Sequence, residues 1–247
     1  MKILLISDVE ERSLWDYWND ATAERLADVG LVLSAGDLKP EYLEFLVTML
    51  NVPLVYVRGN HDGMYDKRPP EGCENADGKL LEVECGRVDS RQKVRILGLG
   101  GSMRYRNDSS DMYTEREMEQ RVRRVERSII LQKVSDAVKA LMSPDKDLMS
   151  PDKDLMSPDA GGNAAEKRPP FDILLTHAPC RGYGDMEDLP HNGFECFNSL
   201  LNKYSPQLHC YGHVHREYGR IDRQLEHPSG ALLINCSGYH IIDFVTP

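Results

Sequence analysis

The sequence predicts an α/β protein with two sheets and helices on their outer faces. Three observations predict this class: short apolar, β-branched runs alternate with helical patterns at the start of the chain, similar runs return after residue 170, and polar motifs follow several of these runs. With 247 residues the chain can bury a full core, and α/β chains of this length often form one domain. We therefore expect a single domain over residues 1–247.

The first sixty residues have the pattern of a βαβαβ unit. The apolar runs Lys2 to Ile6, Leu31 to Ser34 and Leu54 to Val57 predict buried parallel strands. Helical patterns at 20–28 and 40–50 separate these runs. Because ligands bind beyond the carboxyl ends of such strands, the polar residues that follow them are expected to meet at one edge of the sheet.

The middle of the chain predicts two more strands and a long helix. The strands are expected at Lys79 to Glu84 and Lys93 to Leu97, and a glycine-rich turn follows at 98–102. Thr114 and Glu117 form a capping box that opens an amphipathic helix. Its apolar residues recur at helical spacing: Met118, Val122, Val125, Ile129, Val138 and Leu141.

A tandem repeat follows the predicted helix. The sequence Met-Ser-Pro-Asp-Lys-Asp-Leu occurs twice within residues 142–159, and Met-Ser-Pro-Asp then occurs once more. A proline in every copy excludes a continuous helix. We therefore predict a flexible surface loop at about 142–170, which duplication in a tolerant loop explains better than function does.

The last third of the chain predicts a second set of strands around one helix. The helix begins near Asn192-Gly193 and places its apolar residues on one face. The predicted strands are Phe171 to Leu175, Gln207 to Tyr211, Tyr218 to Asp222, Leu232 to Cys236 and His240 to Phe244.

Five polar motifs occur in a fixed order, each where an apolar run ends. They are Asp8-Val9-Glu10, Gly36-Asp37, Gly59-Asn60-His61-Asp62, Thr176-His177-Ala178-Pro179 and Gly212-His213-Val214-His215. Together they supply carboxylates, an amide and imidazoles, the ligands needed to hold two divalent metals about 3.5–4 Å apart. A lone histidine is more often structural, but the ordered set favours a metal centre.

Composition narrows the class of partner. The chain has 40 acidic and 30 basic residues and a net charge of -10, which disfavours nucleic acid and membrane surfaces as partners. The N-terminal apolar run is too short for a signal peptide, and no run approaches the roughly 20 residues of a membrane span. The six cysteines show no C-x-x-C spacing. We expect a cytoplasmic protein with a small substrate, whose oligomeric state the sequence leaves open.

The ordered motifs make the chain similar to the calcineurin-like metallophosphoesterases over nearly its full length outside 142–170. This resemblance implies a four-layer α/β/β/α sandwich of two mixed sheets flanked by helices, with a dinuclear metal centre between the sheet edges. It implies that His61 protonates the leaving group and that Asp62 orients His61. The implied ligands are Asp8 and His215 for the first metal, Asp37 as the bridge, and Asn60, His177 and His213 for the second metal.

The first motif departs from the family pattern, which is usually Asp-x-His where this chain has Glu10. Our hypothesis is that Glu10 binds a metal. Its negative charge would make the centre nearly neutral, so that a monoanionic diester is less disfavoured and Mn²⁺ is preferred over Zn²⁺, with Fe and Mg as further alternatives. In the alternative reading Glu10 points elsewhere and the first metal is held weakly.

The resemblance favours a phosphodiesterase that works by metal-activated hydroxide attack. The stretch from Gly193 to Gly219 resembles small metallophosphoesterase-domain phosphodiesterases that act on cyclic nucleotides. The alternatives are a phosphomonoesterase and a catalytically weak metal-binding scaffold. Gly101 and Arg104 are candidate phosphate contacts, although a tight turn with a surface arginine explains them equally well.

Overall fold

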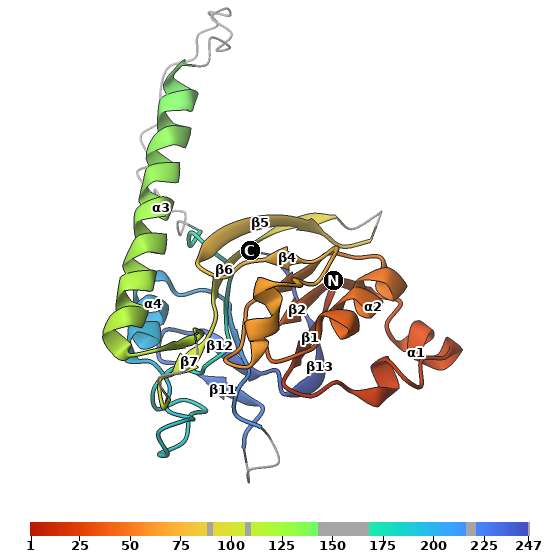
Figure 1. The fold of residues 1–247 in the computed structure, drawn as a ribbon. Helices are drawn as coiled ribbons and strands as arrows, with labels where there is room; N and C mark the ends of the chain where they lie inside the picture. Colours follow the sequence, from red (N-terminus) through yellow and green to blue (C-terminus); the bar gives the residue numbers. More distant parts are fainter. Residues whose placement is uncertain (88–90, 107–109, 143–167, 216–220, 247) are drawn as a thin grey trace, which may run out of the picture.

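The computed structural model describes residues 1–87, 91–106, 110–142, 168–215 and 221–246 (Figure 1). Most of the predicted loop at 142–170 and of the predicted strand at 218–222 therefore lies outside the described residues. No helix among the described residues is long and apolar enough to cross a membrane.

The first sheet has five strands among the described residues, in the order β13-β1-β2-β3-β4. Strands β1 to β4 are parallel to one another, and β13 is antiparallel to β1. Helices α1 and α2 precede β2 and β3, as the βαβαβ pattern predicts. The bounds are β1 Lys2–Ser7, α1 Asp20–Arg25, β2 Val29–Ser34, α2 Pro40–Leu50, β3 Leu54–Tyr56, β4 Glu74–Asn75 and β13 Gly238–Asp243.

The second sheet has six strands among the described residues, in the order β11-β12-β10-β9-β6-β5. Its four central strands are parallel, and its two edge strands are antiparallel to their neighbours. The bounds are β5 Lys79–Cys85, β6 Gln92–Leu99, α3 Glu115–Met142, β9 Ile173–Thr176, α4 Glu195–Tyr204, β10 Leu208–Tyr211, β11 Gln224–Glu226 and β12 Leu232–Asn235. Short elements lie between them: η1 Arg12–Leu14, η2 Asp62–Asp66, β7 Ser102–Met103 and β8 Met112–Tyr113.

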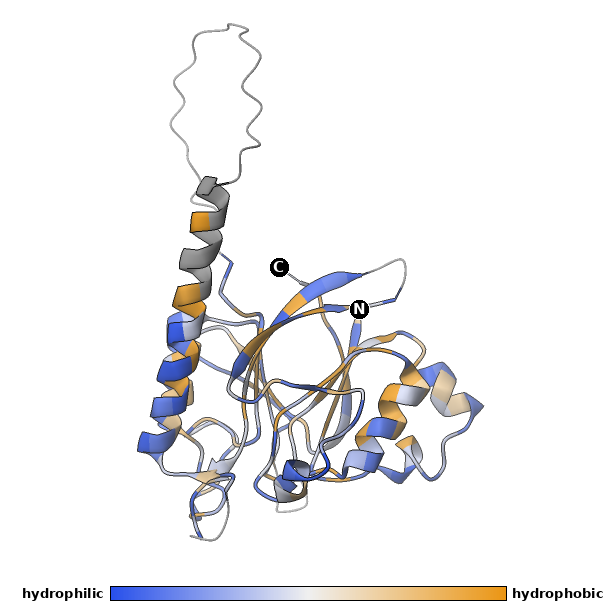
Figure 2. Ribbon diagram, turned by 45° about the horizontal axis from the view of Figure 1, so that its top comes forward, coloured by the Kyte–Doolittle hydropathy of each residue, from blue (hydrophilic) through white to orange (hydrophobic). Residues whose placement is uncertain are grey.

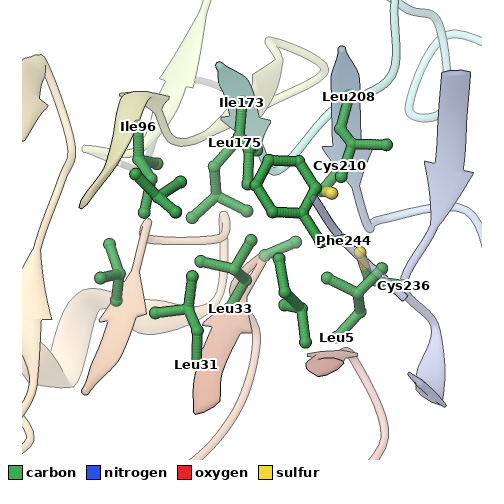
Figure 3. Close-up of a cluster of buried hydrophobic side chains, with 14 of the residues drawn as sticks. Leu5, Leu31, Leu33, Ile96, Ile173, Leu175, Leu208, Cys210, Cys236 and Phe244 are labelled. Carbon is green, nitrogen blue, oxygen red and sulfur yellow. The ribbon is translucent and has the colours of Figure 1, made fainter. Parts of the chain in front are cut away.

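Three buried clusters separate four layers. Successive side chains of a strand face opposite sides of the sheet, so Leu5 packs between the two sheets whereas Leu4 packs beneath α2. Figure 3 shows the central cluster, in which Leu31 and Leu33 of the first sheet lie opposite Ile173 of the second. The outer clusters join the first sheet to α2 and the second sheet to α3 and α4. The predicted α/β/β/α sandwich is therefore confirmed.

Helix α3 begins at the predicted capping box. The Glu117 N–H donates to the Thr114 hydroxyl oxygen at 3.3 Å, and the Thr114 N–H donates to the Glu117 carboxylate at 2.7 Å. The first turns are amphipathic (Figure 2), and Met118 and Val122 are buried against the second sheet. The predicted apolar face does not stay buried along the whole helix, because α3 extends past the sheets (Figure 1) and Val138 is 46% exposed.

Candidate metal centre

The first, second and fifth motifs place non-glycine residues in the left-handed backbone region. The φ angles of Asp8, Asp37 and His213 are 62°, 56° and 69°. Such angles are uncommon outside glycine and persist where surrounding contacts hold them. The Asp8 N–H, for example, donates to the Gly36 carbonyl at 3.1 Å. These turns direct the residues that end β1, β2 and β10 toward one edge of the sandwich.

The Asp8 carboxylate joins the first motif to the fifth. Its two oxygens lie 2.9 and 3.1 Å from the His213 backbone nitrogen, which donates to them. The Ser7 hydroxyl donates to Oδ2 at 2.5 Å. A Cβ on Gly212 would stand 2.9 Å from Asp8 Oδ2, so the fifth motif needs glycine there to approach the carboxylate. Burial raises the pKa of Asp8.

Asp37 and Asp62 join the second motif to the third. Asp37 Oδ1 accepts from the His61 N–H at 2.8 Å. Asp62 Oδ2 accepts from the N–H groups of Asp37 and Gly59 at 2.9 and 2.7 Å. A Cβ on Gly59 would overlap the Asp37 carboxylate, which explains the glycine. Burial and the neighbouring Asp37 charge raise the pKa of Asp62 to about 6.

Backbone carbonyls fix the orientation of the two imidazoles. The Ala35 carbonyl lies 2.7 Å from His177 Nδ1, and the Pro190 carbonyl lies 2.7 Å from His213 Nε2. A carbonyl oxygen can only accept, so each of these ring nitrogens carries the hydrogen. His177 Nε2 and His213 Nδ1 are therefore the nitrogens left to bind a metal, and the carbonyls supply the outer-shell bond typical of ligating histidines.

These donors fit a divalent cation. Ligand atoms of Asp37, His177 and His213 all lie within 4.8 Å of one another. The Asn60 side-chain oxygen lies 3.0 Å from His177 Nε2, so an amide oxygen reaches the same place. A carboxylate, an amide oxygen and two imidazoles suit metals of borderline hardness.

The electrostatics of the cluster agree with a bound cation. Burial disfavours the protonated form of His177. The negative charges of Asp37 and Asp8 together have the larger effect and raise the pKa of His177 to about 9. Burial likewise opposes charge on Asp37, yet His177 and the His61 N–H lower its pKa to about 2. Burial and His177 lower the pKa of His213 to about 3, which favours the neutral ring that a metal ligand requires. The acidic groups thus stabilise positive charge where a metal would bind.

His215 lies at the Asp8 side of the cluster. Its charge is close enough to lower the pKa of Asp8, although burial outweighs it. The structure thus brings all five motifs to one edge of the sandwich, and the assignment of each ligand to a particular metal stays a prediction.

Glu10 has a protein partner in the structure. Its Oε1 accepts from the Lys39 backbone N–H at 3.1 Å, and its Oε2 pairs with Lys39 Nζ at 3.0 Å. Its predicted role as a metal ligand requires at least one of these oxygens to turn from Lys39 to the metal. That role stays a prediction.

The predicted roles of His61 and Asp62 also stay predictions. His61 is exposed, and its charge lowers the pKa of Asp37, which places the ring beside the predicted bridging carboxylate. The hydrogen bonds of the Asp62 carboxylate go to the backbones of Asp37 and Gly59. Asp62 therefore joins the turns of the second and third motifs, and this role is independent of its predicted role in orienting His61.

The candidate phosphate contacts are engaged with other protein groups. The Gly101 N–H donates to the Arg58 carbonyl at 2.8 Å. The Arg104 guanidinium donates to the Met112 carbonyl at 3.1 Å and pairs with Glu117 at 3.0 Å. Substrate contact by Gly101 or Arg104 stays a prediction.

Sequence reasoning missed a loop that lies against the cluster. It contributes the Pro190 carbonyl, and the His191 ring lies 5.2 Å from the His213 ring, centroid to centroid. Asp188 accepts from His191 Nδ1 at 2.7 Å. The loop follows no strand end directly, so the rule that found the five motifs could not find it. Its proximity to β9 and β10 comes from the fold.

A two-sheet sandwich with this donor set at its edge defines a metallophosphoesterase. The chain belongs to the calcineurin-like phosphoesterase family, whose model matches residues 1–217. This family generally uses two divalent metal ions.

Two curated relatives from Caenorhabditis elegans match a short segment. The chain is 40% identical over 53 residues to "UPF0046 protein T07D4.2" and 33% identical over 54 residues to "UPF0046 protein C25E10.12". Each match covers 19% of this chain, and they span 13% and 19% of the relatives.

Solved structures share the fold at low identity. One crystal structure aligns with a TM-score of 0.54 at 15% identity, covering 98% of this chain and 94% of its own. The protein TT1561 of Thermus thermophilus aligns with a TM-score of 0.48 at 13% identity, covering 96% of this chain and 89% of its own. The first alignment supports the fold assignment.

Proposed function

We propose that this phosphoesterase is a cytoplasmic phosphodiesterase that uses two Mn²⁺ ions and accepts cyclic nucleotides among its substrates. The observation that carries the proposal is the carboxylate of Glu10 in the first motif, two residues after Asp8, where the family usually has a histidine. The proposed ligands are Asp8, Glu10 and His215 for one ion, Asp37 for both, and Asn60, His177 and His213 for the other.

The extra carboxylate supports the diester preference. Two divalent ions facing the carboxylates of Asp8, Glu10 and Asp37 and one hydroxide are nearly neutral, whereas histidine at position 10 would leave about one surplus positive charge. A surplus charge favours a dianionic monoester, because Coulomb attraction grows with the charge of the ligand. Glu10 removes that advantage, and its hard oxygens favour Mn²⁺ over Zn²⁺.

The protein residues have separate tasks in the proposed reaction. When bound, the two ions supply Lewis acidity and a water of lowered pKa. Asp8 and Asp37 are held in place by backbone N–H groups, so their carboxylates are oriented before substrate arrives. In the proposed reaction the exposed His61 imidazole donates a proton to the departing oxygen, a general-acid role that histidine often takes in enzymes.

The test is hydrolysis of bis-p-nitrophenyl phosphate and p-nitrophenyl phosphate by metal-stripped protein reconstituted with Mn²⁺. The expected result is diester turnover that Asp37→Asn abolishes. In Glu10→His, the diester-to-monoester ratio should fall and Zn²⁺ should become the better activator. Monoester preference in the wild type would identify a phosphomonoesterase instead, and an unchanged ratio in Glu10→His would contradict the role of Glu10.

The Glu10–Lys39 pair favours one second candidate, a catalytically weak metal-binding scaffold. If Glu10 stays with Lys39, the first ion loses a ligand and is held weakly. If the protein is a scaffold, we expect one tightly bound Mn²⁺ per chain and no turnover of either ester. If it is the proposed enzyme, we expect two tightly bound Mn²⁺ ions per chain. Metal analysis after dialysis separates the two candidates.

A further inference from the structure

A cavity adjoins the residues proposed for the first metal. It has a volume of about 300 Å³, and Val9 and His215 of the first and fifth motifs line it. It is also lined by Glu11, Arg223 and Gly238. Because Gly238 pairs with Ser7 in the β1–β13 register, the cavity lies just beyond the carboxyl end of β1, next to Asp8. A group esterified to a phosphate at the metal centre could extend into it.

Glu11 provides an acceptor in this cavity. Among the described residues its carboxylate has no hydrogen-bond or ion-pair partner, in contrast to the neighbouring Glu10. Gly238 leaves room for it, because a Cβ there would stand 2.9 Å from Glu11 Oε1. The φ angle of Gly238 is +75°, which also favours glycine. The cavity wall is thus shaped around a carboxylate that can receive donors from a ligand.

Arg223 contributes a positive charge at a fixed position in the cavity lining. Its guanidinium donates to the carbonyls of Asn235, Ser237 and Tyr239 at 3.2–3.3 Å. These bonds fix the connection between β12 and β13 that encloses the cavity. The cavity lining therefore contains one cationic side chain, Arg223, and one anionic side chain, Glu11.

The two charges limit what the cavity accepts. Glu11 repels a second phosphate, and Arg223 repels an ammonium group. A neutral group with hydroxyls avoids both repulsions and can donate to the Glu11 carboxylate, as ribose hydroxyls donate to an acidic residue in dinucleotide-binding folds. The volume is at the lower end for ligand pockets, which suits one sugar rather than a polymer.

We propose that this cavity binds the sugar of a nucleoside phosphoester, with Glu11 accepting a hydrogen bond from a sugar hydroxyl. The inference rests on the proposed function, because it assumes that a phosphoester occupies the adjacent metal centre. It deepens that function by naming Glu11 as the residue that selects a ribose over a deoxyribose.

The experiment compares 3′,5′-cyclic AMP with its 2′-deoxy analogue, using Mn²⁺-loaded wild type, Glu11→Met and a matched control, Glu24→Met on the exposed side of α1. The wild type and Glu24→Met should prefer the ribose substrate by about tenfold in kcat/KM, mainly through KM, because a site built for a hydroxyl rejects the analogue that lacks it. Glu11→Met should lose this preference and Glu11→Gln should keep part of it, and in both variants the fall in kcat/KM for the ribose substrate should exceed any change in the turnover of bis-p-nitrophenyl phosphate.

Three outcomes would overturn the proposal. Glu11→Met could retain the ribose preference, or it could lose bis-p-nitrophenyl phosphate turnover to the same extent as nucleotide turnover. A Glu11 dependence found for glycerophosphoethanolamine and not for the nucleotide would show that Glu11 does not select a nucleoside sugar.

A binding measurement separates failure of this inference from failure of the proposed function. If the wild type hydrolyses no diester, calorimetry of AMP and 2′-deoxy-AMP with Mn²⁺-loaded protein still tests the cavity. About tenfold weaker binding of the deoxy ligand, abolished in Glu11→Met, supports the proposal, and equal affinities contradict it.

Discussion

At the scale of single residues, the candidate centre depends on side chains that hold the backbone of neighbouring motifs. Asp8 accepts from the His213 N–H, Asp37 from the His61 N–H, and Asp62 from two N–H groups at once. These carboxylates satisfy buried donors that would otherwise be costly. Each also keeps a turn in a conformation that a free chain rarely adopts.

Asp62→Ala tests this positioning role. The substitution leaves the N–H groups of Asp37 and Gly59 without their acceptor, so we expect the free energy of unfolding to fall by about 2–4 kcal/mol. Asp62→Asn keeps an acceptor and should lose less than half as much. Urea unfolding of metal-stripped protein measures both effects. If Asp62→Asn matched Asp62→Ala in stability, a charge rather than an acceptor would be required.

His209 gives the stability of the protein a pH dependence. Its side chain is fully buried, and its Nε2 lies 2.8 Å from the hydroxyl oxygen of Thr176, the residue before His177. Burial and the nearby His227 lower its pKa to about 3. The unfolded residue binds a proton below about pH 6.5 and the folded one does not, so its contribution to stability is complete above pH 6.5 and is lost toward pH 3.

His209→Gln should therefore flatten the loss of stability in acid. Between pH 6.5 and pH 4.5, the free energy of unfolding of the wild type should fall more steeply than that of the variant, by up to about 1.4 kcal/mol per pH unit. Urea unfolding of the metal-stripped proteins at several pH values checks this. Parallel curves for the two proteins would show that His209 does not titrate as described.

At the scale of elements, α3 supports the centre from a distance. Arg121 donates to the Gly100 carbonyl at 2.7 Å and pairs with Asp77, which accepts from the Gly100 N–H at 2.6 Å. The next residue, Gly101, donates to the Arg58 carbonyl just before the third motif. A chain of hydrogen bonds thus connects the helix to the turn that carries Asn60.

Arg121→Met should cost about 1.5–3 kcal/mol of stability, because the Arg121 and Asp77 side chains are 13% and 16% exposed and the pair is charged. The matched control is Arg123→Met on the same helix, whose pair with Glu119 is 67% and 42% exposed and should contribute less than about 0.5 kcal/mol. Urea unfolding compares them. Equal losses would mean that the Arg121 bonds do not anchor the turn.

At the scale of the whole molecule, the centre joins the two sheets. Asp8, Asp37 and Asn60 follow strands of the first sheet, whereas His177 and His213 follow strands of the second. The apolar core between the sheets packs them against each other, so their edges lie side by side (Figure 3). A metal bound across this seam requires the packed sandwich, so its binding free energy adds to the stability of the fold.

Mn²⁺ should therefore raise the melting temperature. At a free concentration 100 times the Kd, binding to the folded state contributes about 2.7 kcal/mol, or about 5–10 °C for a chain of this length. Thermal unfolding with and without Mn²⁺ measures the shift, and Asp37→Asn should lose most of it. A shift of the same size in that variant would place the bound ion elsewhere.

The sequence by itself determined the layers and the positions of the motifs. Apolar runs located β1 to within a residue, the capping box located the start of α3, and the five motifs located the candidate donors, because each of these signals is local. A strand needs a short apolar run, and in this fold the residue that follows it reaches the sheet edge. Side-chain type then limits the chemistry that the edge can perform.

Only the tertiary structure decided which groups meet at that edge. The Pro190 carbonyl orients His213, Lys39 pairs with Glu10, and Glu11 lines the same cavity as Arg223. Every residue has a carbonyl, and charged side chains occur throughout the chain, so no spacing in the sequence distinguishes these partners. Their contacts exist because the packing of two sheets brings loops from distant parts of the chain within hydrogen-bonding distance.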